Sequence, residues 1–248
     1  MKDSTLIKIR AGVALVAMMF FIGALSAQQA NKGSNPLENI SSRQPLEYGV
    51  LFQGGKGVTA DRDDFKFLMA GVHVGKVLTS SHGPGLFRGN FEYAAELFPY
   101  WQSFTPRFQR VRCRQAAPGG TPPCSRPYIA GGTFGGATVT PIILRWNFAT
   151  HGRIVPWAQA AGGLLWTNHK YPAYGDNTAN FNTNGPNGDS SVWNFTPQGG
   201  IGVHYFFRPE RSLDFSANGV HISSASLGDR NPGVNASVQF SIGYSWWR

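Results

Sequence analysis

A histidine and a serine stand two residues apart near the C-terminal end of the chain, at His221 and Ser223. They continue the apolar positions of an alternating segment, Leu213–Ser224. Side chains of a strand change face at each residue, so His221 and Ser223 are expected to point the same way. An imidazole beside a hydroxyl group can accept its proton and make the oxygen a nucleophile for acyl transfer. The pair therefore predicts an esterase site, with Ser223 as nucleophile and His221 as base; the alternative is a polar pair without chemistry.

The residues around this pair form a longer pattern. His221-Ile222-Ser223-Ser224 is followed, after a short loop, by Asn231-Pro232-Gly233-Val234-Asn235. This pattern resembles the signature of the outer-membrane lipid A 3-O-deacylases, the PagL-like family, in residue types and in the spacing from His221 to Asn235. The resemblance implies a serine esterase that hydrolyses an ester-linked acyl chain of lipid A, with lipopolysaccharide as its substrate and no cofactor.

The resemblance also assigns the remaining site residues. Asn235 stands where the family usually has the acid of the triad, and an Asn can orient a histidine although it supplies no charge. Strict alternation places Asn235 on the opposite face from His221, so its orienting role requires a shift of register. Ser224 stands where the family usually has Asn. Ser224, Asn231 and Gly233 are expected at the oxyanion site or in its turn, and Asn231 is equally compatible with only capping the Asn-Pro-Gly turn.

The N-terminal part of the chain predicts export. A basic start is followed by an apolar core and by Leu25-Ser26-Ala27, so residues 1–27 read as a signal peptide. Residues 28–44 are rich in Asn, Ser and Gln and are expected to be a flexible periplasmic segment, and residues 45–248 the folded domain. Only 14% of the residues are charged, against about a quarter in soluble domains.

Eight alternating segments predict strands in the folded domain. They are Leu46–Gln53, Phe67–Leu78, Gly89–Trp101, Gly132–Phe148, Val155–Asn168, Trp193–Phe207, Leu213–Ser224 and Val234–Trp246. Long and short connections alternate between them, as in outer-membrane barrels with long external loops and short periplasmic turns. The last segment carries apolar residues at even positions and polar residues at Asn235, Ser237, Gln239 and Ser241. We therefore predict an all-β protein, an eight-stranded antiparallel transmembrane β-barrel of the outer membrane; a soluble periplasmic β-sandwich is the alternative fold.

The net charge indicates a binding partner, and the two cysteines indicate a disulfide. The formal net charge of +9 favours anionic lipid headgroups over nucleic acid, because the chain is exported. Cys113 and Cys124 flank a loop rich in turn formers and are expected to form a disulfide outside the cytoplasm. No metal-ligand spacing accompanies them, so no metal is expected. The alternative function is a non-catalytic small outer-membrane barrel, structural, adhesive or porin-like, and a homodimer is left open.

Overall fold

The computed structural model describes residues 43–59, 62–110, 120, 126–150, 152–171, 191–225, 227 and 235–248, without the side chains of 108, 110 and 130. The predicted signal peptide, most of the segment 28–44, both cysteines, Asn231 and Gly233 lie outside these residues, so the export signal, the flexible segment, the disulfide and the roles of Asn231 and Gly233 stay predictions. No helix in the described part of the chain is long and apolar enough to span a membrane. The described elements are β1 (Leu46–Gly57), β2 (Lys66–Val77), the 3-10 turn η1 (Gly85–Phe87), β3 (Gly89–Arg110), β4 (Tyr128–Phe148), β5 (Ile154–Tyr171), β6 (Ser191–Phe195), β7 (Gln198–Arg208), β8 (Arg211–His221) and β9 (Ala236–Trp247).

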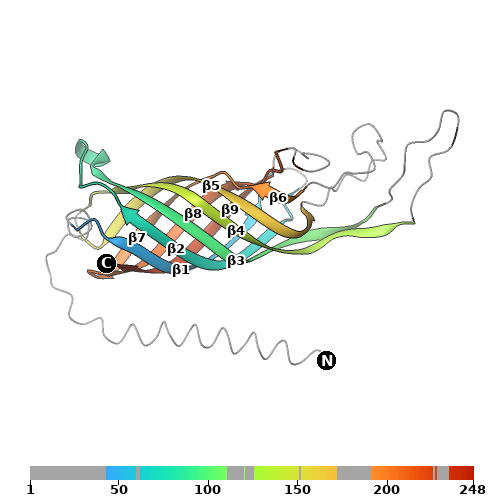
Figure 1. Ribbon diagram of the computed structural model, residues 1–248, viewed down its shortest axis with the longest axis horizontal. Coiled ribbons are helices and arrows are strands. Elements are labelled where there is room, and N and C mark those ends of the chain that lie inside the picture. The colour runs from blue at the N-terminus through green and yellow to red at the C-terminus, as the bar shows by residue number, and fades with distance from the viewer. Residues whose placement is uncertain are drawn as a thin grey trace, which may run out of the picture.

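The strands close into a barrel, shown in Figure 1. From β1 to β5, and from β7 to β9, each strand pairs antiparallel with the next strand in sequence, and β1 pairs with β9, which closes the sheet. β6 and β7 both pair with β5, so together they occupy one strand position. The barrel therefore has eight strand positions. Closure removes the free strand edges that a bilayer cannot hydrate. The predicted eight-stranded antiparallel barrel is confirmed.

The sixth predicted strand, Trp193–Phe207, is interrupted at Thr196 and Pro197. Proline has no N–H to donate, which interrupts the regular ladder. The chain nevertheless stays in the wall, because Thr196 N–H donates to the carbonyl of Gly163 at 2.8 Å and the carbonyl of Pro197 accepts from His221 N–H at 3.0 Å. The break therefore lies directly beside the predicted site.

The predicted long loop Gln102–Gly131 is wrong over much of its length, because β3 continues to Arg110 and β4 begins at Tyr128. These extensions form a hairpin that projects beyond the barrel in Figure 1. β3 continues through Pro106, because the register shifts between Thr105 and Phe108 and a bulge tolerates a proline. Opposite the bulge Gly131 has φ +79°, and a Cβ atom there would lie 2.0 Å from the carbonyl oxygen of Pro106.

The outer surface of the barrel is apolar at alternate positions. On β9, Val238, Phe240 and Ile242 are exposed, whereas Ser237 and Gln239 are buried inside, as the alternation predicts. A belt of exposed apolar side chains continues around the other strands, for example Phe52, Leu68, Val72, Val74, Leu97, Ile142, Leu144, Ile201 and Phe215. So large an apolar surface is unusual for a protein in water and typical of a barrel wall in lipid.

A charge in this belt is expected to destabilise the barrel. Phe240, in the middle of β9, is 64% exposed, and an arginine at the bilayer midplane costs about 2–4 kcal/mol. We expect Phe240→Arg to lower the free energy of unfolding in lipid vesicles by that amount, measured by urea titration. Val58→Arg, just beyond the end of β1, is the control and should cost no more than about 1 kcal/mol. Equal stability of the two variants would contradict a lipid-facing β9.

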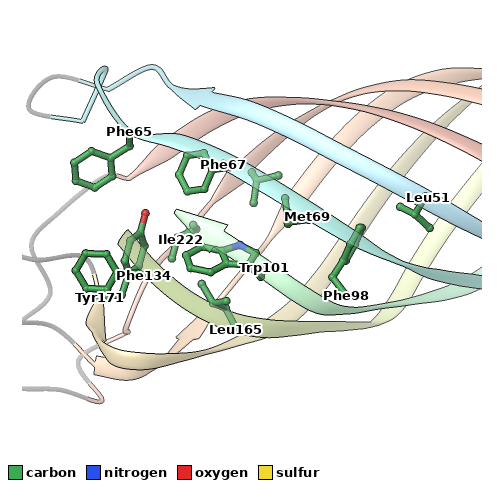
Figure 2. Close-up of a cluster of buried hydrophobic side chains, with 11 residues drawn as sticks. Leu51, Phe65, Phe67, Met69, Phe98, Trp101, Phe134, Leu165, Tyr171 and Ile222 are labelled. Atoms are coloured by element: carbon green, nitrogen blue, oxygen red, sulfur yellow. The ribbon is translucent and has the colours of Figure 1, made fainter. Parts of the chain in front are cut away.

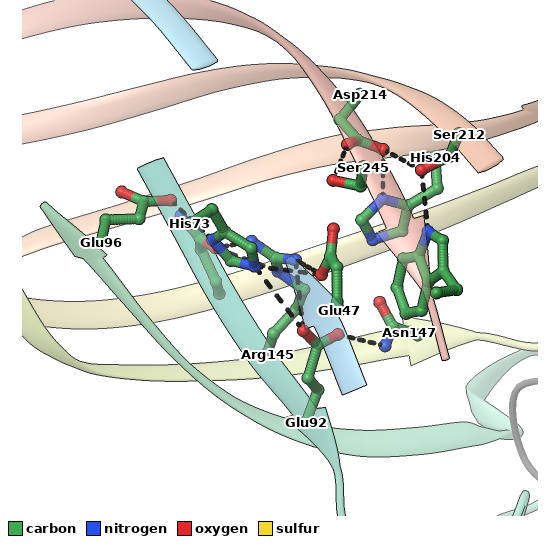
Figure 3. A network of polar contacts seen from close by, with 12 residues as sticks. Glu47, His73, Glu92, Glu96, Arg145, Asn147, His204, Ser212, Asp214 and Ser245 are labelled. Carbon is green, nitrogen blue, oxygen red and sulfur yellow. Dashed lines mark hydrogen bonds and ion pairs between the residues drawn. The ribbon is translucent and has the colours of Figure 1, made fainter. Parts of the chain in front are cut away.

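The barrel interior has an apolar half and a polar half. We call the end at which Leu46 pairs with Arg248 the terminal end and the opposite end the distal end. Toward the distal end the lumen is filled by the apolar cluster of Figure 2, in which Tyr171 contacts Trp101 and Phe134 edge to face at 5.2 and 5.1 Å between ring centroids. Toward the terminal end the lumen holds charged and polar side chains, which Figure 3 shows. The apolar cluster supports the strand ends that carry the predicted site.

Candidate active site

His221 is the last residue of β8 and lies on the outer face of the barrel. Along β8, Ser212, Asn218 and Val220 are buried inside, while Phe215 and Gly219 are exposed outside. His221 has the outward parity and is half-buried. Its main-chain N–H is fixed by the carbonyl of Pro197 across the wall.

Ser223 lies beyond the end of β8, yet it keeps the alternation of the strand. Its main chain forms a bridge with Phe195, with N···O distances of 3.0 and 2.7 Å, and Ile222 N–H donates to the carbonyl of Asn235 at 2.8 Å. Ile222 and Ser224 are 2% and 1% exposed and face inward, so Ser223, half-buried, faces outward like His221. The structure therefore places His221 and Ser223 on one surface at the distal part of the wall.

The two side chains are not joined by a hydrogen bond. Nδ1 of His221 is buried and has no hydrogen-bond partner among the described residues, while Oγ of Ser223 accepts from the N–H of Ala225 at 3.2 Å. Catalytic hydrogen bonds are often long without substrate and tighten when it binds. The shared face and the free imidazole nitrogen are compatible with a nucleophile and its base.

Ala225 has a strained backbone next to the serine. Its φ is +45°, in the left-handed region that non-glycine residues rarely adopt. The turn that fixes this conformation is closed by Leu227 N–H, which donates to the carbonyl of Ser224 at 2.9 Å. Strain of this kind persists only where the surroundings hold it, and it is common at functional sites. Here it aims a backbone N–H at the Ser223 hydroxyl oxygen, which no residue pattern could have revealed.

Asn235 does not reach His221. It is 1% exposed and faces the interior, near Tyr171 of the apolar cluster. Neither its amide nitrogen nor its amide oxygen hydrogen-bonds with a described residue, so it makes no bond to the imidazole. No described carboxylate takes its place, because Nδ1 of His221 is without a partner and no hydrogen bond of its Nε2 is present among the described residues. The predicted orienter and the predicted base thus lie on opposite faces of the wall.

Ser224 also faces inward, and its buried side chain lies on the other side of the wall from Ser223. Of the positions expected at the oxyanion site, the described part of the chain therefore offers only the backbone of Ser224, and the backbone N–H of Ala225, which was not expected there, lies beside it. Asn231 and Gly233 belong to the loop outside the described residues, and their predicted roles stay predictions.

The lipid-facing wall below His221 carries unusually small residues. Gly219 pairs with Gly199 on β7, and Gly199 pairs with Ala160 on β5; all three are exposed. We call these three residues the small-residue patch. Large apolar side chains lie beside it, with Ile201 67% and Phe240 64% exposed. Sequence reasoning did not single out this patch, although the alternation of Gly199 and Ile201 in β7 was a visible signal.

The chain is similar to known proteins in sequence and in fold. A family model described as "Lipid A 3-O-deacylase (PagL)" matches residues 92–245. No curated protein sequence matches the chain. Similar solved structures include the outer membrane enzyme PagL, with 14% identity, a TM-score of 0.42 and coverage of 80% of this chain and 98% of the other. Neisserial surface protein A is similar at 11% identity, with a TM-score of 0.45 and coverage of 81% and 96%. The barrel protein OprG from Pseudomonas aeruginosa is similar at 9% identity, with a TM-score of 0.43 and coverage of 83% and 96%.

The family model spans well over half of the chain and includes His221, Ser223 and the strands that hold them. Its description names the enzyme class that the sequence pattern around these two residues indicates. A closed antiparallel barrel with an apolar outer face is, in addition, the architecture that an enzyme embedded in the outer membrane requires. The chain therefore belongs to the lipid A 3-O-deacylase (PagL) family of outer-membrane β-barrel proteins.

Proposed function

We propose that this protein is a lipid A 3-O-deacylase, which hydrolyses an ester-linked acyl chain of lipid A in the outer membrane. One observation carries the proposal. In a chain of this family, His221 and Ser223 are both half-buried and, two residues apart, both face outward on the lipid-facing wall. An ester within a bilayer reaches a nucleophile only on such a surface. The distal end, with the long connections, faces the outside in this proposal, because lipid A occupies the outer leaflet.

The residues would perform acyl transfer in two steps. Ser223 Oγ attacks the ester carbonyl carbon while His221 accepts the hydroxyl proton. The bond between that carbon and the sugar oxygen breaks, and His221 returns the proton to the sugar hydroxyl. Water then hydrolyses the acyl-serine with the same base and releases the fatty acid. The N–H of Ala225, 3.2 Å from Ser223 Oγ, is our candidate donor to the oxyanion.

The proposal is tested with purified lipid A and the protein folded in detergent. We expect one ester-linked fatty acid to be released per lipid A, measured by gas chromatography. A correctly folded barrel that releases no acid from several lipid A structures would leave the non-catalytic barrel as the better account. Folding is checked independently by heat-modifiable gel mobility.

We propose that His221 and Ser223 act without help from Asn235. Its inward side chain makes no bond to His221, so Asn235→Ala should leave turnover within about threefold of wild type, whereas loss of a real orienting residue costs up to about 10⁴-fold. For the same reason Asn235→Glu, which restores the usual family residue, should not accelerate the reaction. Initial rates of acid release measure both variants. Slower turnover in Asn235→Ala together with faster turnover in Asn235→Glu would return Asn235 to the site.

The small-residue patch is where we place the acyl chain that is cut. Backbone is accessible at Gly199 and Gly219, so an acyl chain can lie close to the wall below His221. A Cβ atom at Gly219 would have its nearest contact at 3.8 Å, so larger side chains fit without disturbing the fold. We expect Gly219→Leu to displace two or three methylene groups of the substrate, each worth about 0.8 kcal/mol, and to lower kcat/KM by at least about tenfold.

Gly135→Leu is the matched control for this prediction. Gly135 lies on β4, away from β8, and a Cβ there would also have its nearest contact at 3.8 Å. The control variant should keep wild-type kcat/KM, measured on lipid A in mixed micelles. Equal losses in both variants, or no loss in Gly219→Leu, would remove the patch from the substrate-binding surface.

A further inference from the structure

The polar half of the lumen contains a histidine whose outer ring nitrogen is unused. His204, on β7, is 1% exposed. Its Nδ1 lies 2.6 Å from Oδ1 of Asp214, and Asp214 in turn accepts from the hydroxyls of Ser212 at 2.7 Å and Ser245 at 2.5 Å, as Figure 3 shows. Nε2 of His204 is buried and has no hydrogen-bond partner among the described residues. Asp214 thus fixes the ring and leaves Nε2 facing into the lumen.

Two buried carboxylates lie where this nitrogen points. Glu47 of β1 and Glu92 of β3 are 1% and 0% exposed. One carboxylate oxygen of each and a ring nitrogen of His204 all lie within 4.8 Å of one another. Oε1 of Glu92 forms no hydrogen bond with a described residue and makes only the longer ion-pair contacts, at 3.5 Å to Arg145 and 3.9 Å to His73. Glu47 Oε2 contacts Arg145 at 3.1 Å and His73 at 3.0 Å, which leaves its second oxygen for another partner.

The charges of this cluster do not balance. The residues drawn in Figure 3 include four carboxylates, those of Glu47, Glu92, Glu96 and Asp214, and one guanidinium, that of Arg145, which lies 3.1 Å from Glu47 and 3.5 Å from Glu92. His73 touches Glu47, Glu92 and Glu96 and adds a positive charge only when protonated. Uncompensated charge is costly in a buried site.

We propose that Glu47, Glu92 and His204 bind a divalent transition-metal ion of the zinc class inside the barrel. An imidazole and two carboxylates suit such an ion, and imidazole disfavours magnesium and calcium. Metal-binding histidines commonly donate their other ring N–H to a carboxylate, as His204 does to Asp214. A cavity of about 30 Å³, lined by the proposed ligands Glu47 and His204 and by Asp214 and Arg145, has room for a water molecule beside these two ligands.

The ion would tie three strands, β1, β3 and β7, across the lumen, and it lies apart from His221 and Ser223 on the outer face. Its role is structural, and it does not depend on the proposed deacylase activity. The ligands are far apart in the sequence, which explains why no ligand spacing indicated a metal site. Only the closure of the barrel brings them together.

The test is refolding of the full, untagged chain in detergent with cobalt(II) or zinc. After removal of unbound ions, metal content is measured by mass spectrometry and cobalt coordination by its visible absorption. We expect one ion per wild-type chain and a higher thermal unfolding temperature with the ion than without it. His204→Ala and Glu92→Gln should bind none, and Asp214→Asn should bind about 10–100-fold more weakly because the ring loses its carboxylate partner.

Two controls make the result decisive. His82→Ala removes an exposed imidazole in the terminal-end turn and should bind like wild type, which excludes adventitious imidazole binding. Heat-modifiable gel mobility identifies the variants that fold. If His204→Ala does not fold, Glu92→Gln, which keeps the side-chain shape, provides the test of the ligand set. A wild-type barrel that folds without binding an ion, or retention of the ion by either folded ligand variant, would overturn the proposal.

Discussion

Ser223→Ala is expected to abolish release of fatty acid from lipid A, with a loss of at least about 10⁴-fold in kcat. In the proposed mechanism the Ser223 hydroxyl oxygen forms the covalent intermediate. Its neighbours Ile222 and Ser224 are buried on the inner side of the wall and cannot replace it. Because Ser223 is half-buried on the surface and its Oγ accepts one hydrogen bond, from Ala225 N–H, the substitution should leave the barrel intact.

The measurement is the single-turnover rate of acid release, with heat-modifiable mobility as the check on folding. Ser80→Ala, in the exposed turn at the terminal end, is the matched control and should keep the wild-type rate. A Ser223→Ala variant that retains more than about one hundredth of wild-type turnover would exclude Ser223 as the nucleophile.

His221→Ala is expected to be nearly as damaging as Ser223→Ala, because the hydroxyl would lose its base. Residues that act as one unit are strongly non-additive, so the double variant should be no slower than either single variant. Rates of acid release for the two single variants, the double variant and His82→Ala measure this. Independent effects, with the double variant slower by the product of the two single losses, would mean that His221 does not act through Ser223.

The barrel could be predicted because alternation carries most of the information. Residues such as Phe240 and Gln239 occupy outward and inward positions as the sequence pattern indicates, and strand closure follows from the need to avoid free edges in lipid. Two local features of the strands could not be predicted from the residue types. A bulge accommodates Pro106 within β3, and Pro197 divides a strand without removing it from the wall.

The candidate site could be predicted as far as parity extends. Two residues on one strand share a face by geometry alone, so His221 and Ser223 were predicted together, and the same alternation correctly placed Asn235 on the opposite face. Any partner of His221 from the loop between Ser224 and Asn235 depends on the path of that loop. The N–H of Ala225 depends on a single left-handed backbone angle. Neither the loop path nor that angle has a signature in residue types.

The most direct test of the deacylase proposal is the mass of lipid A in a Gram-negative host that expresses this chain. We expect wild-type protein to convert lipid A to a species that lacks one ester-linked acyl chain, with tandem mass spectrometry placing the loss at the 3 position, and Ser223→Ala to leave lipid A unchanged. An unchanged lipid A profile with well-folded wild-type protein in the outer membrane, or the same conversion by Ser223→Ala, would contradict it.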